Sequence, residues 1–476
     1  MEESVITPGT RGFIATAVVS AIIACSFFFS IVNREPIVGD GLDNLTIAKN
    51  IISYSSFSSS SPEKPDMARE PAWPALTAGV IRIASLEKIP VDVLSSRYFY
   101  VWKIINIFLY AISIGLAAAY LFSKIRSRIF LGLFLTVSLL LYGTMPRLIN
   151  NFNNEALAAL LALLSSMIFY EMMKGRLIDS RLFAPVLLGV FLGFLALTKA
   201  QFLYISFPLI LILFVINKKK SLIVIFALLV VTAPWLYRNF TLFGDPAIAK
   251  RGKIVASVRV VLTAEPTARE HLCMAYAFSH PAIQSYMEPF LGIAQRDFSQ
   301  GGKCQKLNRE ICFDMGSKRV HCAPFPEDAF SPDWASKIQY FYRGYYAGVQ
   351  MEENKATFAD ITRFDFKFFK NYVKTLPLFA WRGFGFSDFP LLSVMISLSV
   401  FGLLFTSYWP FALLCVCSQL FHIFLTHNIP RYHVVEFPVL IFSAIYLLWL
   451  FWHHYFRFIN LFGRKSPHGK KADFPD

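Results

Sequence analysis

The chain has 476 residues, of which 55% are hydrophobic and 16% are charged, and its formal net charge is +15. A mean hydropathy of +0.49 excludes an ordinary soluble globular protein and indicates a membrane protein with several spans. An excess of basic residues is also typical of nucleic-acid-binding proteins. Here, however, the basic residues fall between apolar segments, so we expect no nucleic-acid partner.

Apolar segments of a length suited to membrane spans recur along the whole chain. The first is interpreted as an uncleaved span, because its apolar run continues well past Cys25 and the residues before it are not clearly basic. About ten spans are predicted, several of them short, at residues 12–32, 100–122, 129–145, 155–173, 183–199, 201–217, 221–238, 389–406, 409–425 and 433–452. The predicted fold class is therefore an all-α polytopic membrane protein.

The short loops between these segments predict the orientation of the chain. Their basic residues gather at 123–128, 174–181 and 217–220, and again in the tail at 463–471. Basic loops face the cytoplasm, and alternating the spans from a cytoplasmic N-terminus puts all four segments on that side. Two long polar regions, at 33–99 and 239–388, are then extracytoplasmic.

Three parts follow from this arrangement. Residues 1–238 form an N-terminal transmembrane module whose first outer loop, at 33–99, carries an acidic motif. Residues 239–388 form a large extracytoplasmic loop, and residues 389–476 form the last transmembrane helices and a basic cytoplasmic tail. Apolar residues at three- and four-residue spacing predict amphipathic helices lying in the membrane interface within both outer loops.

The first outer loop begins with the acidic motif "GDGLDNLTIAKNI", which contains Asp40 and Asp43. Gly39 favours a turn, and Asp43 is placed to cap a helix that is predicted to begin at Asn44. Asp40 therefore has no evident structural role of this kind, in contrast to Asp43. Its position where the first span ends makes it a candidate for chemistry at the membrane surface.

Single acids and bases stand at the outer ends of the later spans. Glu155 opens an apolar helix, where the helix dipole favours an anion. Lys199, Arg238 and Arg431 each lie near a span end, where basic side chains commonly extend to the lipid headgroups. Because the predicted orientation places all of these span ends on the same side of the membrane, these residues can also form one site. Both interpretations stay open on the sequence alone.

The large outer loop contains four cysteines. Cys273, Cys304, Cys312 and Cys322 predict two disulfides, with three possible connectivities. A metal site is the alternative, since His271 and His321 lie nearby, but the spacing matches no zinc pattern. We therefore favour disulfides and expect no metal.

Several segments together resemble the GT-C superfamily of integral-membrane glycosyltransferases, close to bacterial relatives of protein O-mannosyltransferases and of the aminoarabinose transferase acting on lipid A. They lie between residues 39 and 438 and read "GDGLDNLTIAKNI", "REPAWP", "NNEALAALL", "GVFLGFLALTKAQ", "APWLYRNFTLFGDP" and "PRYHVVEFP". The chain departs from the family where many relatives have a second acid or a tyrosine. Asp43 and Asn44 occupy that place, so the resemblance does not decide which aspartate is the catalytic one.

The resemblance implies a GT-C-like bundle and a sugar donor linked to a polyprenyl phosphate. Asp40 is the expected general base, with Asp43 second, and Glu155 would orient the sugar or the first loop. The basic residues expected to bind the donor phosphate are Lys199, Arg238, Arg431 and Arg69. Further candidates for the site are Glu70, Tyr432 and His433.

No cofactor is expected, although a divalent metal stays open because some relatives use one. The acceptor is a lipid, a glycan or a protein, and the expected location is the bacterial inner membrane, with the active site facing the periplasm. Two other classes remain open. One is a transporter or flippase of lipid-linked sugars, and the other is an enzyme like the O-antigen polymerases and ligases.

Overall fold

The computed structural model describes residues 8–175, 182–250, 259, 267–298, 302–304, 310–314, 320–324, 366–385, 388–426, 428 and 430–463. The basic segment at 176–181, the middle of the large loop at 325–365 and the tail after 463 lie outside these residues. Within them the regular elements are helices and one antiparallel pair of strands, β1 (Glu310–Asp314) and β2 (Val320–Pro324).

Every apolar segment of the sequence forms a helix close to its predicted position. These helices are α1 (Pro8–Ile31), α5 (Phe99–Ile125), α6 (Arg128–Gly143), α8 (Glu155–Met173), α9 (Phe183–Thr198), α10 (Phe202–Ile216), α11 (Lys218–Phe243), α19 (Pro390–Leu403), α20 (Trp409–Leu425) and α21 (Phe437–Gly463). Among the described residues, five helices are long and apolar enough to cross a membrane: α1, α5, α8, α11 and α21. The other five are equally apolar but have only 10–17 residues. These are the features of a helical membrane protein.

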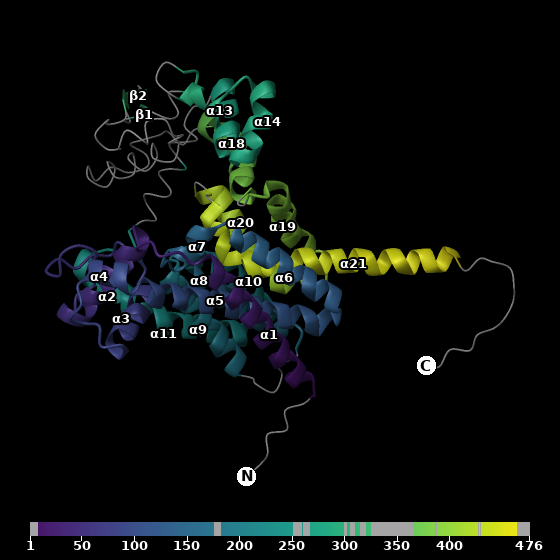
Figure 1. Cartoon of the computed structure of the whole chain (residues 1–476), viewed down its shortest axis with the longest axis horizontal. Coiled ribbons are helices and arrows are strands. Elements are labelled where there is room, and N and C mark those ends of the chain that lie inside the picture. Colours follow the sequence, from purple (N-terminus) through teal and green to yellow (C-terminus); the bar gives the residue numbers. More distant parts are fainter. Residues whose placement is uncertain are drawn as a thin grey trace, which may run out of the picture.

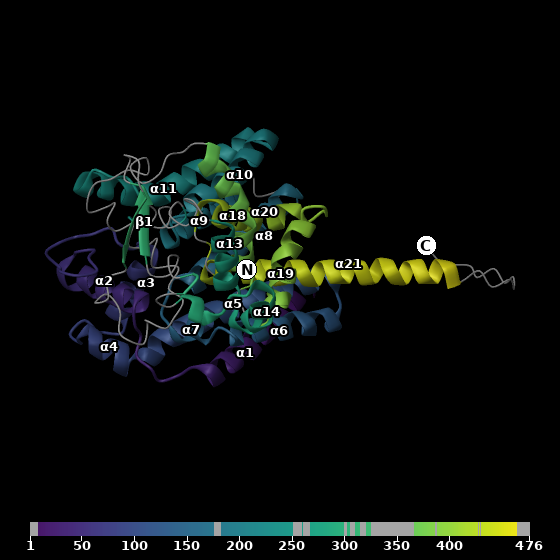
Figure 2. The ribbon, with the colours of Figure 1, turned by 90° about the horizontal axis from the view of Figure 1, so that it is seen from above.

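The helices form one bundle, and among its five long helices α5, α8 and α21 have more buried residues than α1 and α11. Figure 1 shows helix α21 projecting from one side of the bundle, opposite the helices of the first loop, and Figure 2 shows the same arrangement from above. Small residues allow two pairs of helices to approach closely. Gly115 of α5 faces the backbone of Ala17 on α1, and Gly189 of α9 faces the backbone of Val224 on α11.

The first loop folds into three helices, α2 (Asp40–Tyr54), α3 (Ala72–Ile83) and α4 (Val91–Arg97), at one end of the bundle (Figure 1). Their shared core contains Trp73 and Trp102, both 0% exposed. Both rings pack on Phe152, with centroids 4.7 and 5.4 Å away. The loop is therefore a packed unit, and the side chains that it carries have defined positions.

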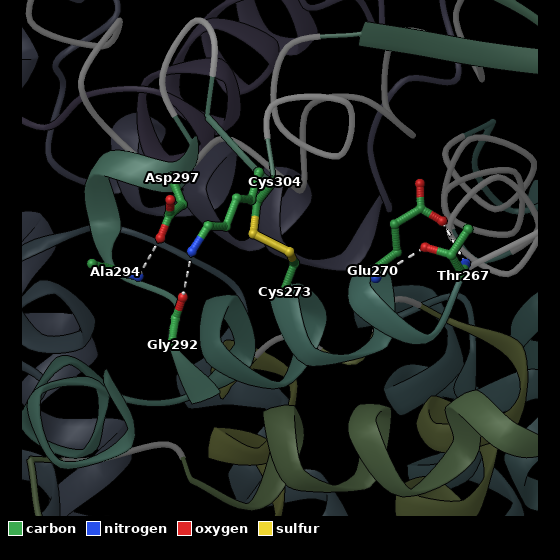
Figure 3. Close-up of a disulfide and its surroundings, with 8 residues drawn as sticks. Thr267, Glu270, Cys273, Gly292, Ala294, Asp297 and Cys304 are labelled. Carbon is green, nitrogen blue, oxygen red and sulfur yellow. Dashed lines mark hydrogen bonds between the residues drawn. A yellow bond between two sulfur atoms is a disulfide. The ribbon is translucent and has the colours of Figure 1, made fainter. Parts of the chain in front are cut away.

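The large loop builds a second small core from α13 (Ala268–Phe278), α14 (Pro281–Leu291), η1 (Gln295–Phe298) and α18 (Phe366–Phe384), which lie above the bundle in Figure 1. Helix α13 begins with a capping box, in which Thr267 Oγ1 accepts a hydrogen bond from the N–H of Glu270 at 3.2 Å. Beside it, Asp297 accepts a hydrogen bond from the N–H of Ala294 at 2.7 Å (Figure 3).

A disulfide joins Cys273 to Cys304 within this core, with an S–S distance of 2.02 Å (Figure 3). Cys273 is therefore not available as the thiolate ligand of a zinc site. The other two cysteines of the predicted pairs, Cys312 and Cys322, occupy directly opposite positions on β1 and β2. Their side chains lie outside the part of the chain that the structure describes.

Candidate active site

Charged residues from four separate parts of the chain meet at the end of the bundle that carries the first loop. Asp40 is the first residue of α2, and Glu155 is the first residue of α8. Lys199 follows the last residue of α9, and Arg431 lies in the short helix η4 (Pro430–Glu436). Each charge sits at the end of an element, where the apolar faces of the bundle stop.

The start of α2 differs from the sequence prediction. Gly39 has a φ of 56°, a conformation that glycine adopts without strain, and the helix begins directly after it at Asp40. The N-cap has no side-chain hydrogen bond, so the prediction that Asp43 caps this helix is wrong. Asp40 and Asp43 instead lie in the first turn, and both carboxylates contact Arg69.

The most buried part of the site is centred on Glu155, whose side chain is 0% exposed. Its Oε1 accepts hydrogen bonds from Lys199 Nζ at 2.9 Å and from Arg431 Nε at 2.6 Å. Its other oxygen, Oε2, is buried and has no hydrogen-bond partner within the described residues. Two cations from different elements therefore converge on one buried oxygen.

The more open part of the site is centred on Asp40, whose side chain is 24% exposed. Its Oδ1 accepts from Arg69 Nη2, and its Oδ2 accepts from Arg431 Nη2 at 2.7 Å. Arg69 also pairs with Asp43, whose side chain is 40% exposed. Burial lowers the pKa of Arg69, but hydrogen bonds and charge from Asp40, and then from Asp43, outweigh burial and raise its pKa overall.

These contacts link six side chains in a row of alternating charge. We call them the ion network, and in order of contact they are Asp43, Arg69, Asp40, Arg431, Glu155 and Lys199. Three carboxylates balance three cations, so the network as a whole is neutral. Arg431 is its central link, because it alone contacts both Asp40 and Glu155.

Four of the predicted site residues lie outside the ion network, and two of them are Arg238 and Glu70. Arg238 of α11 donates from Nη1 to the carbonyl oxygen of Asp66 at 3.2 Å, and its guanidinium lies 4.5 Å from the ring centre of Trp235. It therefore holds the segment of the first loop that leads to Arg69. Glu70 is half-buried and forms no hydrogen bond or ion pair with another described residue.

The other two predicted residues belong to η4. The ring of Tyr432 stacks on His422 of α20 with centroids 4.6 Å apart, and His422 Nε2 lies 2.9 Å from the side-chain nitrogen of Gln201. His433 is fully buried. Its Nε2 lies 2.8 Å from Asn428 Oδ1, and its Nδ1 lies 3.2 Å from a carboxylate oxygen of Glu436. These contacts fix η4 and hence the position of Arg431.

The sequence reasoning missed Lys103, which positions the acidic motif. Lys103 of α5 is 0% exposed, and its Nζ donates to the carbonyl oxygens of Asn33 and Glu35 at 3.1 and 2.8 Å. It thereby anchors the segment that leads from α1 to Asp40. The available signal was a lysine inside an apolar segment, since such residues are rare in spans and usually have a specific partner.

Within the described residues, no group of three or more histidine, cysteine, aspartate or glutamate side chains is arranged to hold a metal ion. The acids of the site are instead paired with cations. No family model matches the chain, and neither does any curated protein or solved structure. The resemblance to GT-C glycosyltransferases stays a prediction from the sequence.

Proposed function

We propose that the protein is a GT-C-like glycosyltransferase that moves a sugar from a polyprenyl-phosphate donor to an acceptor hydroxyl. One observation carries this proposal. Asp40 shares Arg431 with the buried pair of Glu155 and Lys199, at the end of a bundle of apolar helices. A carboxylate and two cations at that depth suit the transfer of a group from a lipid-linked phosphate.

The chemistry is a single displacement. The acceptor oxygen attacks the anomeric carbon while Asp40 takes the hydroxyl proton. The bond between the anomeric carbon and the phosphate oxygen breaks, and its electron pair stays with the phosphate, which remains on the lipid. The charge on the phosphate grows during this step, so Arg431 and Lys199 stabilise the transition state more than the bound donor. The anomeric configuration is inverted.

The proposal includes an arrangement in the membrane. The five shorter apolar helices also cross, so that the chain has about ten spans, and the basic loops face the cytoplasm. The ion network then lies at the periplasmic surface of a bacterial inner membrane, with the helices of the first loop in the interface. The donor would place its lipid tail among the helices and its phosphate at the network.

The position of the charges supports a transferase over a transporter. Transporters of charged substrates commonly place ionisable residues near the middle of the membrane, at breaks within helices. Here Asp40 and Glu155 are the first residues of helices, and Lys199 directly follows one. The network is thus at one end of the bundle, where a phosphate and a water-soluble acceptor can meet.

The test is sugar transfer by the full chain in proteoliposomes. Polyprenyl-phosphate mannose and polyprenyl-phosphate aminoarabinose are supplied with lipid, glycan and protein fractions as acceptors. The released polyprenyl phosphate is then measured. Asp40→Asn should slow release about 100-fold or more, because it removes the base. Asp92→Asn is the matched control, because Asp92 is an exposed aspartate of the same loop.

Two results would contradict the proposal. One is full activity in both Asp40→Asn and Asp43→Asn. The other is movement of the donor between leaflets with no release of polyprenyl phosphate, which would favour the transporter class instead.

A further inference from the structure

Arg431 is the cation of the ion network that an incoming anion reaches first. Its side chain is 37% exposed, whereas those of Lys199 and Arg69 are 9% and 7% exposed. Its partners in the described chain are Glu155 through Nε and Asp40 through Nη2. The third nitrogen, Nη1, forms no hydrogen bond there, so it is available to a ligand.

A phosphate at Arg431 would compete directly with Asp40. Guanidinium groups bind phosphate most strongly through two nitrogens. Nε is held by Glu155, which is completely buried, so a phosphate has to use Nη1 and Nη2. Nη2 is the nitrogen that holds Asp40, so a phosphate on it would bring a second anion against the Asp40 carboxylate, and the two negative charges would repel each other.

The same contact also limits Asp40 as a base. Both of its oxygens accept hydrogen bonds from guanidinium groups, Oδ1 from Arg69 and Oδ2 from Arg431. Each of these hydrogen bonds stabilises the carboxylate without a proton, so the loss of one makes Asp40 a stronger base for the acceptor hydroxyl. The Arg69 side chain is 7% exposed and that of Arg431 is 37% exposed, so Oδ2, which Arg431 holds, is the oxygen that a ligand from solvent can release.

We propose that the donor phosphate displaces Asp40 from Arg431 and thereby makes the base available to the acceptor. This inference rests on the proposed function and adds an order of events to it. In the free protein Asp40 occupies the phosphate site, so an acceptor that arrives first meets an engaged carboxylate. The donor therefore binds before the acceptor, and donor binding prepares the base.

The proposal predicts an unusual effect of removing the base. Asp40→Asn should strengthen the binding of undecaprenyl phosphate about tenfold, because a competing charge-assisted hydrogen bond is lost. Asp43→Asn is the matched control: it makes the same change in charge three positions away, but Asp43 pairs with Arg69, and Arg431 pairs with Asp40 and Glu155. It should change the affinity by less than about twofold, since the Asp43 side chain is 40% exposed and its charge is screened by solvent and by Arg69.

The experiment measures the affinity of the full chain in detergent micelles for undecaprenyl phosphate and for undecaprenol, which lacks the phosphate. If the wild-type protein binds both equally, the proposed function fails and the inference fails with it. If the phosphate binds more tightly than the alcohol but Asp40→Asn and Asp43→Asn behave alike, the inference alone is overturned. A tenfold gain confined to Asp40→Asn supports it.

A second measurement covers the case in which Asp40→Asn does not fold. A structure of the wild-type protein with undecaprenyl phosphate should show the phosphate on Nη1 and Nη2 of Arg431, with Asp40 Oδ2 more than 4 Å from that guanidinium (the pair is 2.7 Å apart without a ligand). A bound phosphate with the pair of Arg431 and Asp40 intact would refute the displacement.

Discussion

The variant Glu155→Gln tests how strongly the ion network holds the bundle together. The substitution keeps the shape of the side chain and removes its charge at a position that is 0% exposed. Arg431 keeps Asp40 as a partner, but Lys199, only 9% exposed, loses its carboxylate. Removing one member of a buried ion pair leaves an uncompensated charge and typically costs about 3–5 kcal/mol. We expect the free energy of unfolding to fall by that amount.

The measurement is reversible unfolding in mixed micelles, followed by tryptophan fluorescence. Glu171→Gln is the matched control, because Glu171 lies on the same helix and pairs with Lys124 at 3.0 Å, but its side chain is 20% exposed. It should cost about 1 kcal/mol or less. The double variant Glu155→Gln with Lys199→Gln should recover part of the loss, since it removes the unpaired cation as well.

A cost of Glu155→Gln no larger than that of Glu171→Gln would contradict this prediction. The prediction would also be contradicted if the loss of unfolding free energy in the double variant equalled the sum of the losses in the two single variants. Either result would mean that the contact between Glu155 and Lys199 is not a strongly coupled pair in the folded protein, despite its burial.

Two further variants test a helix contact within the bundle and the disulfide of the large loop. Gly189→Leu should lower the free energy of unfolding by about 1–3 kcal/mol, because the new side chain meets the backbone of Val224 on α11, and Gly132→Leu, which has open space around it, should be near neutral. Equal effects of the two in a thermal unfolding assay would contradict the close helix contact. Cys273→Ser should destabilise the core of the large loop by about 3–4 kcal/mol, because the disulfide to Cys304 closes a separation of 31 residues. Limited proteolysis measures this loss, and cleavage at the wild-type rate would show that the disulfide is not needed.

Hydropathy was enough to locate the helices, because each apolar segment has to bury its backbone polar groups in hydrogen bonds of its own. The segment at 155–173, for example, matches α8 at both ends. Helix length is a weaker guide to which helices cross the membrane, since several apolar helices have too few residues to be assigned as spans from the structure alone. Helix α21 runs eleven residues past its predicted end at 452, through a segment in which aromatic and apolar residues alternate with polar ones.

The residues of the site could be selected from the sequence, but their pairing could not. The predicted orientation of the spans places Asp40, Glu155 and Arg431 at the same end of the bundle. It places Arg238 there as well, so it cannot tell which of the two arginines pairs with the acids. The structure separates them through local contacts: Arg238 is engaged by the carbonyl oxygen of Asp66 and the ring of Trp235. Such contacts depend on how the first loop folds back, which hydropathy and spacing do not encode.

The pair of Arg431 and Asp40 is also the contact that joins two separately anchored units. Asp40 belongs to the first loop, which Lys103 fixes to α5 through the backbone of Asn33 and Glu35. Arg431 belongs to η4, which follows Asn428, and Asn428 donates to the carbonyl oxygen of Phe379 on α18 at 2.7 Å.

Each unit therefore keeps its position when the pair opens, because its anchor lies elsewhere. The contact between Glu155 and Lys199 remains as well, since it links α8 to the end of α9. A ligand that takes the place of Asp40 on Arg431 thus has to break one ion pair and leaves the rest of the site in place. This makes displacement by an anion a local change that needs no rearrangement of the bundle.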